Sequence, residues 1–222
     1  MVAVEVLINL HKIGFKLVPV GEDRKTPNVS GLLTPEETQR SIEESDDGKE
    51  HPVNYIYGHP DFWNEERLKR QASRFNNVAT TFGKTRLKDE NGSDLYLNQL
   101  DIDSEEVFTK LANIRIKDKE YFFIDQMCKT TYVTKTRKKW GYHIYWLSCK
   151  QNSPIGTKDC KSGCEFEIKT DNSCGLGTLP PSPHRDDLNF HYQCIGQNKI
   201  SIQDGLYDGK DSCGLHKNRK QL

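Results

Sequence analysis

Hydrophobic and polar positions in the first ninety residues alternate between helical and strand-like spacing. Helical spacing appears over 2–12, 34–50 and 61–75, and strand-like runs appear over 15–20 and 76–86. Thr34 precedes a proline and two glutamates, which is typical of a capped helix start. The first part of the chain is therefore predicted to be a mixed αβ unit.

From residue 95 the pattern changes to short β-rich runs separated by turn residues. We expect a strand over 95–103, a helix beginning at Ser104, and then strands over 131–137, 141–148, 164–170 and 175–179. The run 121–127 fits either a helix or a strand. The second part is therefore predicted to hold an antiparallel sheet. The polar segment 204–222 is expected to be a linker or a tail.

Two aspartates lie near the end of the predicted strand 95–103. Side chains alternate along a strand, so Asp101 and Asp103 share one face about 6.6–6.8 Å apart, while Leu100 and Ile102 face the other way. Two carboxylates at this spacing can reach one divalent ion above the sheet. Acid-x-acid triplets are common, because 32 of the 222 residues are acidic. About five such triplets are expected by chance in a chain of this composition. The pair needs support from other segments.

A second segment places a histidine on a strand beside a basic turn. His143 lies within the run 141–148, and Arg137, Lys138 and Lys139 precede it. Such a basic turn suits a triphosphate or a nucleic-acid backbone. A buried structural histidine and a merely solvated turn are the alternatives.

A third segment supplies further carboxylates. Glu165 and Glu167 share a face of the predicted strand 164–170, and parity cannot separate them. If this strand lies about 4.8 Å from the strand that carries Asp101, three carboxylates converge. Two metal ions about 3.5–4 Å apart need such a set for an in-line phosphoryl or nucleotidyl transfer.

Composition sets limits on the partners and the compartment. Lysine and arginine balance aspartate and glutamate at 32 each, so the net charge does not indicate a polyanionic partner. The N-terminus lacks the features of a signal peptide, and we expect a cytoplasmic protein that does not bind membranes. The seven cysteines are expected to be reduced. A structural zinc is an open alternative, with ligands drawn from Cys160, Cys164, Cys174, His184, His191 and Cys194, although none has Cys-x-x-Cys spacing.

The motifs "LDID", "WGYHIYW" and "FEIKT", the last followed by "TLPPSPH", occur in that order. Together with "GFKLVPVGEDRKTPN" and "NNVATTFGK" upstream, they resemble the archaeo-eukaryotic primase superfamily. The specific likeness is to its prim-pol branch, the bifunctional primase–polymerases of archaeal plasmids, viruses and related mobile elements. The resemblance covers most of the chain. It departs at Gly141, where many members have serine, and at Glu167, where aspartate is common.

The resemblance implies an α+β fold. A prim-pol domain would span 1–203, with an N-terminal αβ unit (1–90) packed on a catalytic unit with an antiparallel, RRM-like sheet (91–203). Two Mg²⁺ or Mn²⁺ ions would be held by Asp101, Asp103 and Glu167, the family's residue order favouring Glu167 over Glu165. The nucleotide would be bound by His143, Arg137, Lys138, Lys139, Ser182, His184 and Arg185.

The function implied is template-dependent nucleotidyl transfer by a DNA primase and DNA polymerase. Its partners would be a single-stranded DNA template and primer, NTPs or dNTPs, and a C-terminal helicase or priming-helper domain. One alternative is a metal-dependent nuclease, which would not need the triphosphate-binding residues. The other is a non-catalytic nucleic-acid-binding module, which predicts a broken carboxylate set.

Overall fold

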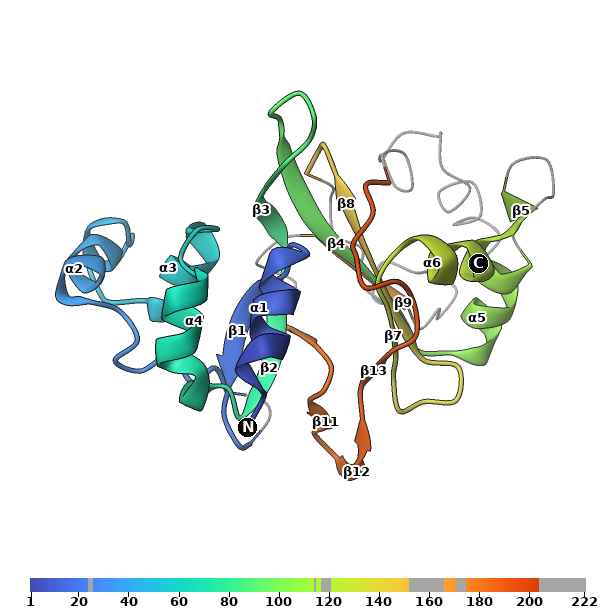
Figure 1. The fold of residues 1–222 in the computed structure, drawn as a ribbon, viewed down its shortest axis with the longest axis horizontal. Coiled ribbons are helices and arrows are strands. Elements are labelled where there is room, and N and C mark those ends of the chain that lie inside the picture. The colour runs from blue at the N-terminus through green and yellow to red at the C-terminus, as the bar shows by residue number, and fades with distance from the viewer. Residues whose placement is uncertain (24–25, 114, 117–120, 152–165, 171–174, 204–222) are drawn as a thin grey trace.

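The computed structural model describes residues 1–23, 26–113, 115–116, 121–151, 166–170 and 175–203. The fold is α+β, as predicted, and every strand pair among these residues is antiparallel. Figure 1 shows helices α2–α4 at one end, α5 and α6 at the other, and the sheets between them. Within the described part of the chain, no helix is both long enough and apolar enough to cross a membrane.

The helices cluster in two groups along the chain. They are α1 (Val4–Lys12), α2 (Pro35–Glu43), α3 (Pro52–Gly58), α4 (Glu65–Gln71), followed by a 3-10 turn (Ala72–Arg74), then α5 (Glu105–Ala112) and α6 (Phe123–Thr130). Thr34 and Glu37 form a capping box at α2, and Ser104 caps α5, both as predicted. The sequence patterns did not predict α3, which begins at a proline and has only two buried side chains, Tyr55 and Ile56.

The strands form two principal sheets and two short ribbons. They are β1 (Lys16–Val20), β2 (Asn77–Thr81), β3 (Gly83–Lys88), β4 (Asp94–Ile102), β5 (Arg115–Ile116), β6 (Tyr121–Phe122), β7 (Val133–Lys135), β8 (Tyr142–Ser148), β9 (Phe166–Lys169), β10 (Gly177–Thr178), β11 (Pro183–His184), β12 (Asp187–His191) and β13 (Gln193–Cys194). The run 121–127, which fitted either a helix or a strand, contains strand β6 and the start of α6.

The small sheet has the order β1-β2-β10, and the large sheet has the order β13-β7-β8-β4-β3. Gly83, with φ of 86°, lies at the point where the chain leaves β2 and enters β3, and this left-handed conformation favours glycine. β9 also pairs with β4, beyond the residues that β3 occupies. The end of β4 that carries Asp101 therefore lies between β8 and β9.

The large sheet is buried on both faces by different cores. Leu100, Ile144 and Ile168 pack against α5 and α6 on one face. On the other face, Leu97 and Tyr145 join the apolar side chains of the N-terminal elements. Because side chains alternate along β4, Asp101 belongs to this second face, beyond Leu97. The polar end of the sheet therefore faces the N-terminal unit.

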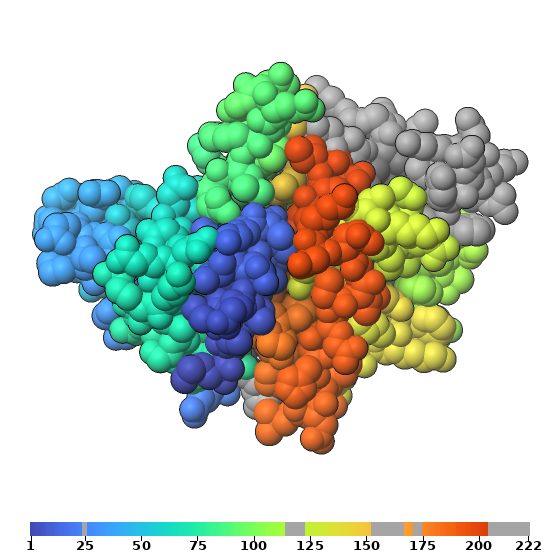
Figure 2. All heavy atoms as spheres, viewed as in Figure 1, coloured from blue at the N-terminus to red at the C-terminus, as the bar shows by residue number. Residues whose placement is uncertain are grey.

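The described residues 175–203 connect the two principal sheets. β10 pairs with β2 in the small sheet, whereas β13 pairs with β7 in the large sheet. Figure 2 shows residues 175–203 (orange to red) lying between the N-terminal half (blue to cyan) and α6 (yellow-green). Residues 175–203 thus contact both the small sheet and the large sheet.

Candidate functional site

Three neighbouring strands place a histidine, an aspartate and a glutamate in one row. Asp101 of β4 lies directly opposite His143 of β8 and directly opposite Glu167 of β9. Facing residues in antiparallel strands have Cβ atoms about 4.5–5.5 Å apart, so all three side chains project from the same face. The structure thus places Asp101 next to Glu167, which is 66 positions away in the sequence.

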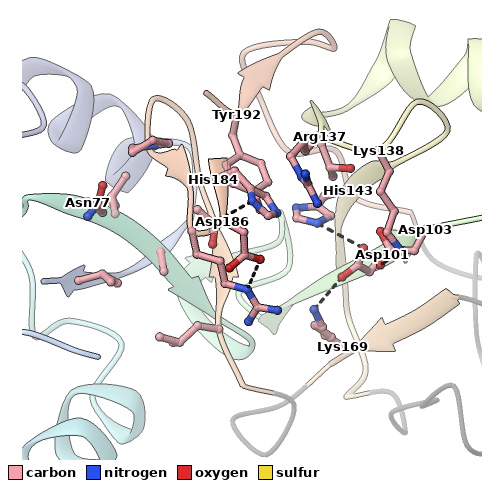
Figure 3. Close-up of a pocket in the computed structure, with 18 of the residues that line it drawn as sticks. Asn77, Asp101, Asp103, Arg137, Lys138, His143, Lys169, His184, Asp186 and Tyr192 are labelled. Atoms are coloured by element: carbon pink, nitrogen blue, oxygen red, sulfur yellow. Dashed lines mark hydrogen bonds and ion pairs between the residues drawn. The ribbon is translucent and has the colours of Figure 1, made fainter. Parts of the chain in front are cut away.

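The row forms the floor of a cavity of about 750 Å³ (Figure 3). Residues of β2, among them Asn77 and Val78, form one wall. The turn between β7 and β8 contributes Arg137 and Lys138. The segment after β10 contributes Pro183, His184, Arg185, Asp186 and Tyr192. Most residues that the sequence singled out therefore meet in one place.

Asp101 is the most buried carboxylate of the cavity, with a side chain 16% exposed. Burial alone would raise its pKa, but His143 and Lys169 outweigh burial and hold the pKa of this carboxyl well below its ordinary value. Lys169 Nζ lies 2.9 Å from Oδ2, and His143 Nε2 lies 3.3 Å from Oδ1. Oδ1 accepts no hydrogen bond from the described residues. An ionised, buried carboxylate thus has one oxygen that accepts no hydrogen bond from these residues, although it lies beside the His143 ring.

The other two predicted carboxylates also lie beside lysines. Asp103 is 3.1 Å from Lys138 Nζ, and Glu167 is 3.5 Å from Lys169 Nζ. Among the described residues, no three His, Cys, Asp or Glu side chains are arranged to hold a metal ion as they stand. The donor chemistry nevertheless suits Mg²⁺ or Mn²⁺, since these ions prefer carboxylate oxygens and Asp101 Oδ1 is not hydrogen-bonded. The donor atoms are thus of the kind that such ions bind, while Lys138 and Lys169 lie beside the carboxylates in this structure.

Lys135, which does not line the cavity, holds the basic turn together. Lys135 Nζ donates to the backbone carbonyls of Lys138, Lys139 and Gly141 at 2.5, 2.8 and 3.0 Å. This bonding fixes the turn, so Arg137 and Lys138 line the cavity. Lys139, which was predicted to bind nucleotide, lies instead over the ring of Trp140 at 4.6 Å and does not line the cavity.

Glycine is required at position 141 because its backbone lies against Thr136, at the start of the same turn. A Cβ atom at this position would lie 1.8 Å from Oγ1 of Thr136, far inside van der Waals contact. Thr136 is 5% exposed and lines the cavity. The hydroxyl of Thr136 therefore occupies the space that a side chain at 141 would need.

The segment after β10 was predicted to present Ser182, His184 and Arg185 to the nucleotide. His184 and Arg185 do line the cavity, but Ser182 is 1% exposed and does not. Its hydroxyl accepts from the backbone N–H of Val78 at 2.8 Å and donates to the Val78 carbonyl at 3.1 Å. The structure gives Ser182 an anchoring role, because these bonds fasten the segment to β2.

Tyr192 connects the two histidines of the cavity. Its ring stacks near His143 at 5.7 Å and near His184 at 6.0 Å between centroids (Figure 3). Burial lowers the pKa of His184, and Arg137 and Arg185 lower it further, against the opposing effect of Asp186 and Asp187. These effects favour the neutral form of His184, whose Nδ1 accepts a hydrogen bond from the backbone N–H of Asp186 at 3.1 Å.

Several predicted residues lie outside the described part of the chain. These are Glu165, the rival for the third carboxylate, and the candidate zinc ligands Cys160, Cys164 and Cys174. Cys194 is described, as an exposed free thiol on β13. The zinc hypothesis stays a prediction.

Sequence patterns missed Lys169 and Tyr192 as members of the site. Lys169 follows Glu167 by two positions, so strand parity already placed it on the same face, and only its role was overlooked. No local pattern marks Tyr192, because its place depends on the return of the chain from β12 towards β13. Asp186, which pairs with Arg185 at 3.2 Å, was also not predicted.

No model of a known protein family matches the chain, and no curated protein matches it.

Proposed function

We propose that the chain is a template-dependent nucleotidyltransferase, a DNA primase and polymerase that acts on single-stranded DNA with two Mg²⁺ or Mn²⁺ ions. The observation that carries the proposal is the row His143–Asp101–Glu167 across three adjacent strands, with cationic side chains at its rim. A buried ionised carboxylate, a facing acid and a facing histidine in one cavity suit phosphoryl chemistry better than they suit a structural role.

The charges that line the cavity suit a substrate that binds together with divalent cations. The described lining residues include four carboxylates, Asp101, Asp103, Glu167 and Asp186, and four permanent cations, Arg137, Lys138, Lys169 and Arg185. Four minus four leaves no net charge, counting the histidines as neutral. A bare triphosphate gains little from such a cavity, whereas a triphosphate accompanied by divalent ions can match both sets of groups.

Each side chain has a distinct task in the proposal. Asp101, Asp103 and Glu167 would hold the ions, which supply a lowered pKa for the attacking 3′-hydroxyl and charge stabilisation for pyrophosphate. Arg137, Lys138 and Arg185 would bind the phosphate oxygens, with His143 and His184 completing the set. The His143 ring is held by Asp101 on one side and Tyr192 on the other.

The proposal extends to the archaeo-eukaryotic primase fold. Strands β7, β8, β4 and β9 form an antiparallel sheet with α5 and α6 on one face, which is the layout expected of an RRM-like unit. The opposite face carries the acids and meets the N-terminal αβ elements. The residues to which the resemblance gives the nucleotide line a cavity between this sheet and β2.

A gel assay tests the activity. The protein is incubated with a single-stranded template, with or without a primer, with NTPs or dNTPs and with Mg²⁺ or Mn²⁺, and the products are resolved under denaturing conditions. We expect products whose sequence is complementary to the template. They should disappear in Asp101→Asn and persist in the control Asp94→Asn, because Asp94 lies on the same strand but pairs with Lys84 outside the cavity.

Two outcomes would contradict the proposal. Shortening of the DNA that depends on Asp101, without any extension, would identify a metal-dependent nuclease. DNA binding without any chemistry, unchanged in Asp101→Asn, would identify a non-catalytic nucleic-acid-binding module.

A further inference from the structure

Lys169 lies between two of the carboxylates assigned to the metal ions. Its ammonium group is 2.9 Å from Asp101 Oδ2 and 3.5 Å from Glu167 Oε2, and its side chain is 13% exposed. Figure 3 shows it pointing from β9 towards Asp101. The backbone of β9 is fixed by its pairing with β4, where Lys169 lies opposite Gln99. The position of this cation is therefore built into the sheet.

The same space is the one that a bridging divalent ion would need. Carboxylate oxygens bind such ions at about 2.0–2.6 Å, closer than they approach an ammonium group. An ion that bridges Asp101 Oδ2 and Glu167 Oε2 would therefore lie where the Nζ atom of Lys169 now lies. The two positive charges would also repel each other strongly in a partly dehydrated site. Lysine and ion cannot both occupy this position.

We propose that Lys169 competes with the divalent cation for Asp101 and Glu167 and thereby sets the cation affinity of the cavity. The inference rests on the proposed function, because that function is what assigns the two carboxylates to a cation. It concerns a residue to which neither the motifs nor the resemblance gave a role.

The second lysine of the cavity provides an internal contrast. Lys138 pairs with Asp103, but these side chains are 50% and 43% exposed, so water screens the pair and little is lost when it is broken. The pair at Lys169 is far more buried, and removing its cation takes from the buried Asp101 carboxylate the ammonium group at Oδ2, while His143 remains 3.3 Å from Oδ1. A divalent ion would then be bound more tightly at Asp101, whereas removal of Lys138 should change the affinity far less.

The experiment measures Mn²⁺ binding directly, by the loss of the free-ion electron paramagnetic resonance signal on titration, without nucleotide or DNA. Lys169→Met removes the charge and keeps the apolar length of the side chain, Lys169→Gln keeps a donor, and Lys169→Arg keeps the charge. Lys138→Met is the exposed contrast within the cavity. Lys84→Met is the matched control, because Lys84 also pairs with an aspartate but lies outside the cavity. Thermal unfolding of each variant checks that the fold is kept.

We expect Lys169→Met and Lys169→Gln to bind Mn²⁺ at least about tenfold more tightly than the wild type. Lys169→Arg and Lys84→Met should remain within about twofold of the wild type, and Lys138→Met within about threefold. The tighter binding should vanish when Asp101→Asn is added. If Lys169→Met fails to fold, Lys169→Gln is compared with the wild type in its place. If both fail to fold, Lys169→Arg still tests whether a positive charge at this position is enough for the wild-type affinity.

The inference and the proposed function fail in different ways. If the wild type binds Mn²⁺ through Asp101 and the charge-removing variants bind it equally or more weakly, Lys169 is not a competitor and the proposed function stands. If neither the wild type nor any variant binds Mn²⁺ through Asp101 in this titration, the metal assignment itself is wrong and both fall together.

Discussion

Replacement of Gly141 by alanine would test how the basic turn is held at the cavity. The added Cβ atom would lie 1.8 Å from Thr136 Oγ1, 3.1 Å from Lys138 Cβ and 3.2 Å from Thr136 Cβ. The last two contacts are tight but can be relieved by small shifts. The first cannot, because the hydroxyl oxygen and the new carbon overlap, so Thr136 must leave its rotamer or the turn must move.

The cost of such overpacking is about 1–3 kcal/mol of unfolding free energy. Thr136→Ala should be nearly neutral, because Oγ1 of Thr136 makes no hydrogen bond to the residues that the structure describes. The double variant Gly141→Ala with Thr136→Ala removes the shortest contact and should recover at least about 1 kcal/mol relative to Gly141→Ala alone.

Urea denaturation, followed by far-UV circular dichroism, measures these differences. The apparent affinity for a dNTP should fall in Gly141→Ala and recover in the double variant, because the turn carries Arg137 and Lys138 into the cavity. Equal stabilities of Gly141→Ala and the wild type would refute the reasoning. So would a double variant that is no more stable than Gly141→Ala.

Three further changes test other parts of the structure. Ser182→Ala leaves the backbone of Val78 without its side-chain partner and should cost about 1–3 kcal/mol in urea denaturation; an unchanged midpoint would show that Ser182 does not anchor the segment. Burial, reinforced by Arg86, lowers the pKa of His11 to about 4. The contribution of the neutral His11 ring to the free energy of unfolding is therefore complete above the ordinary histidine pKa and is lost as the pH falls towards 4. The wild type should lose up to about 3 kcal/mol more than His11→Gln between pH 7 and pH 4, and parallel pH profiles would contradict this. Tyr192→Leu should raise the KM for dNTP about tenfold, whereas Tyr192→Phe keeps the stacked ring and should stay near the wild type; equal effects of the two would exclude a role of the ring in placing the histidines.

Strand parity predicted the polar face of the large sheet, since it separated Asp101 from Leu100 without any knowledge of the fold. The same rule could not say which strands are neighbours. That Glu167 faces Asp101 depends on β9 pairing with β4 beyond the end of β3, which is a non-local arrangement. Capping chemistry at Thr34 and Ser104 was also predictable, because caps are made by residues close in sequence.

Other features could not be predicted because they depend on packing between distant segments. Ser182 follows two prolines in an exposed-looking turn, yet its hydroxyl is buried against β2. The basic residues of the turn were equivalent in sequence, but Lys135 binds backbone carbonyls and Lys139 lies over Trp140. Composition and motif order identify the kinds of groups that a site needs, whereas their partners are decided by the fold.

The most direct test of the central claim is the rate at which a single complementary dNTP is added to a primed template. Glu167→Gln keeps the size of the side chain and removes its charge, and Glu106→Gln, on the exposed start of α5, is the control. The account predicts at least about a hundredfold loss of rate in Glu167→Gln and no more than about a twofold change in Glu106→Gln. A wild-type protein that adds no nucleotide above the Asp101→Asn background, or a Glu167→Gln variant with the wild-type rate, would contradict it.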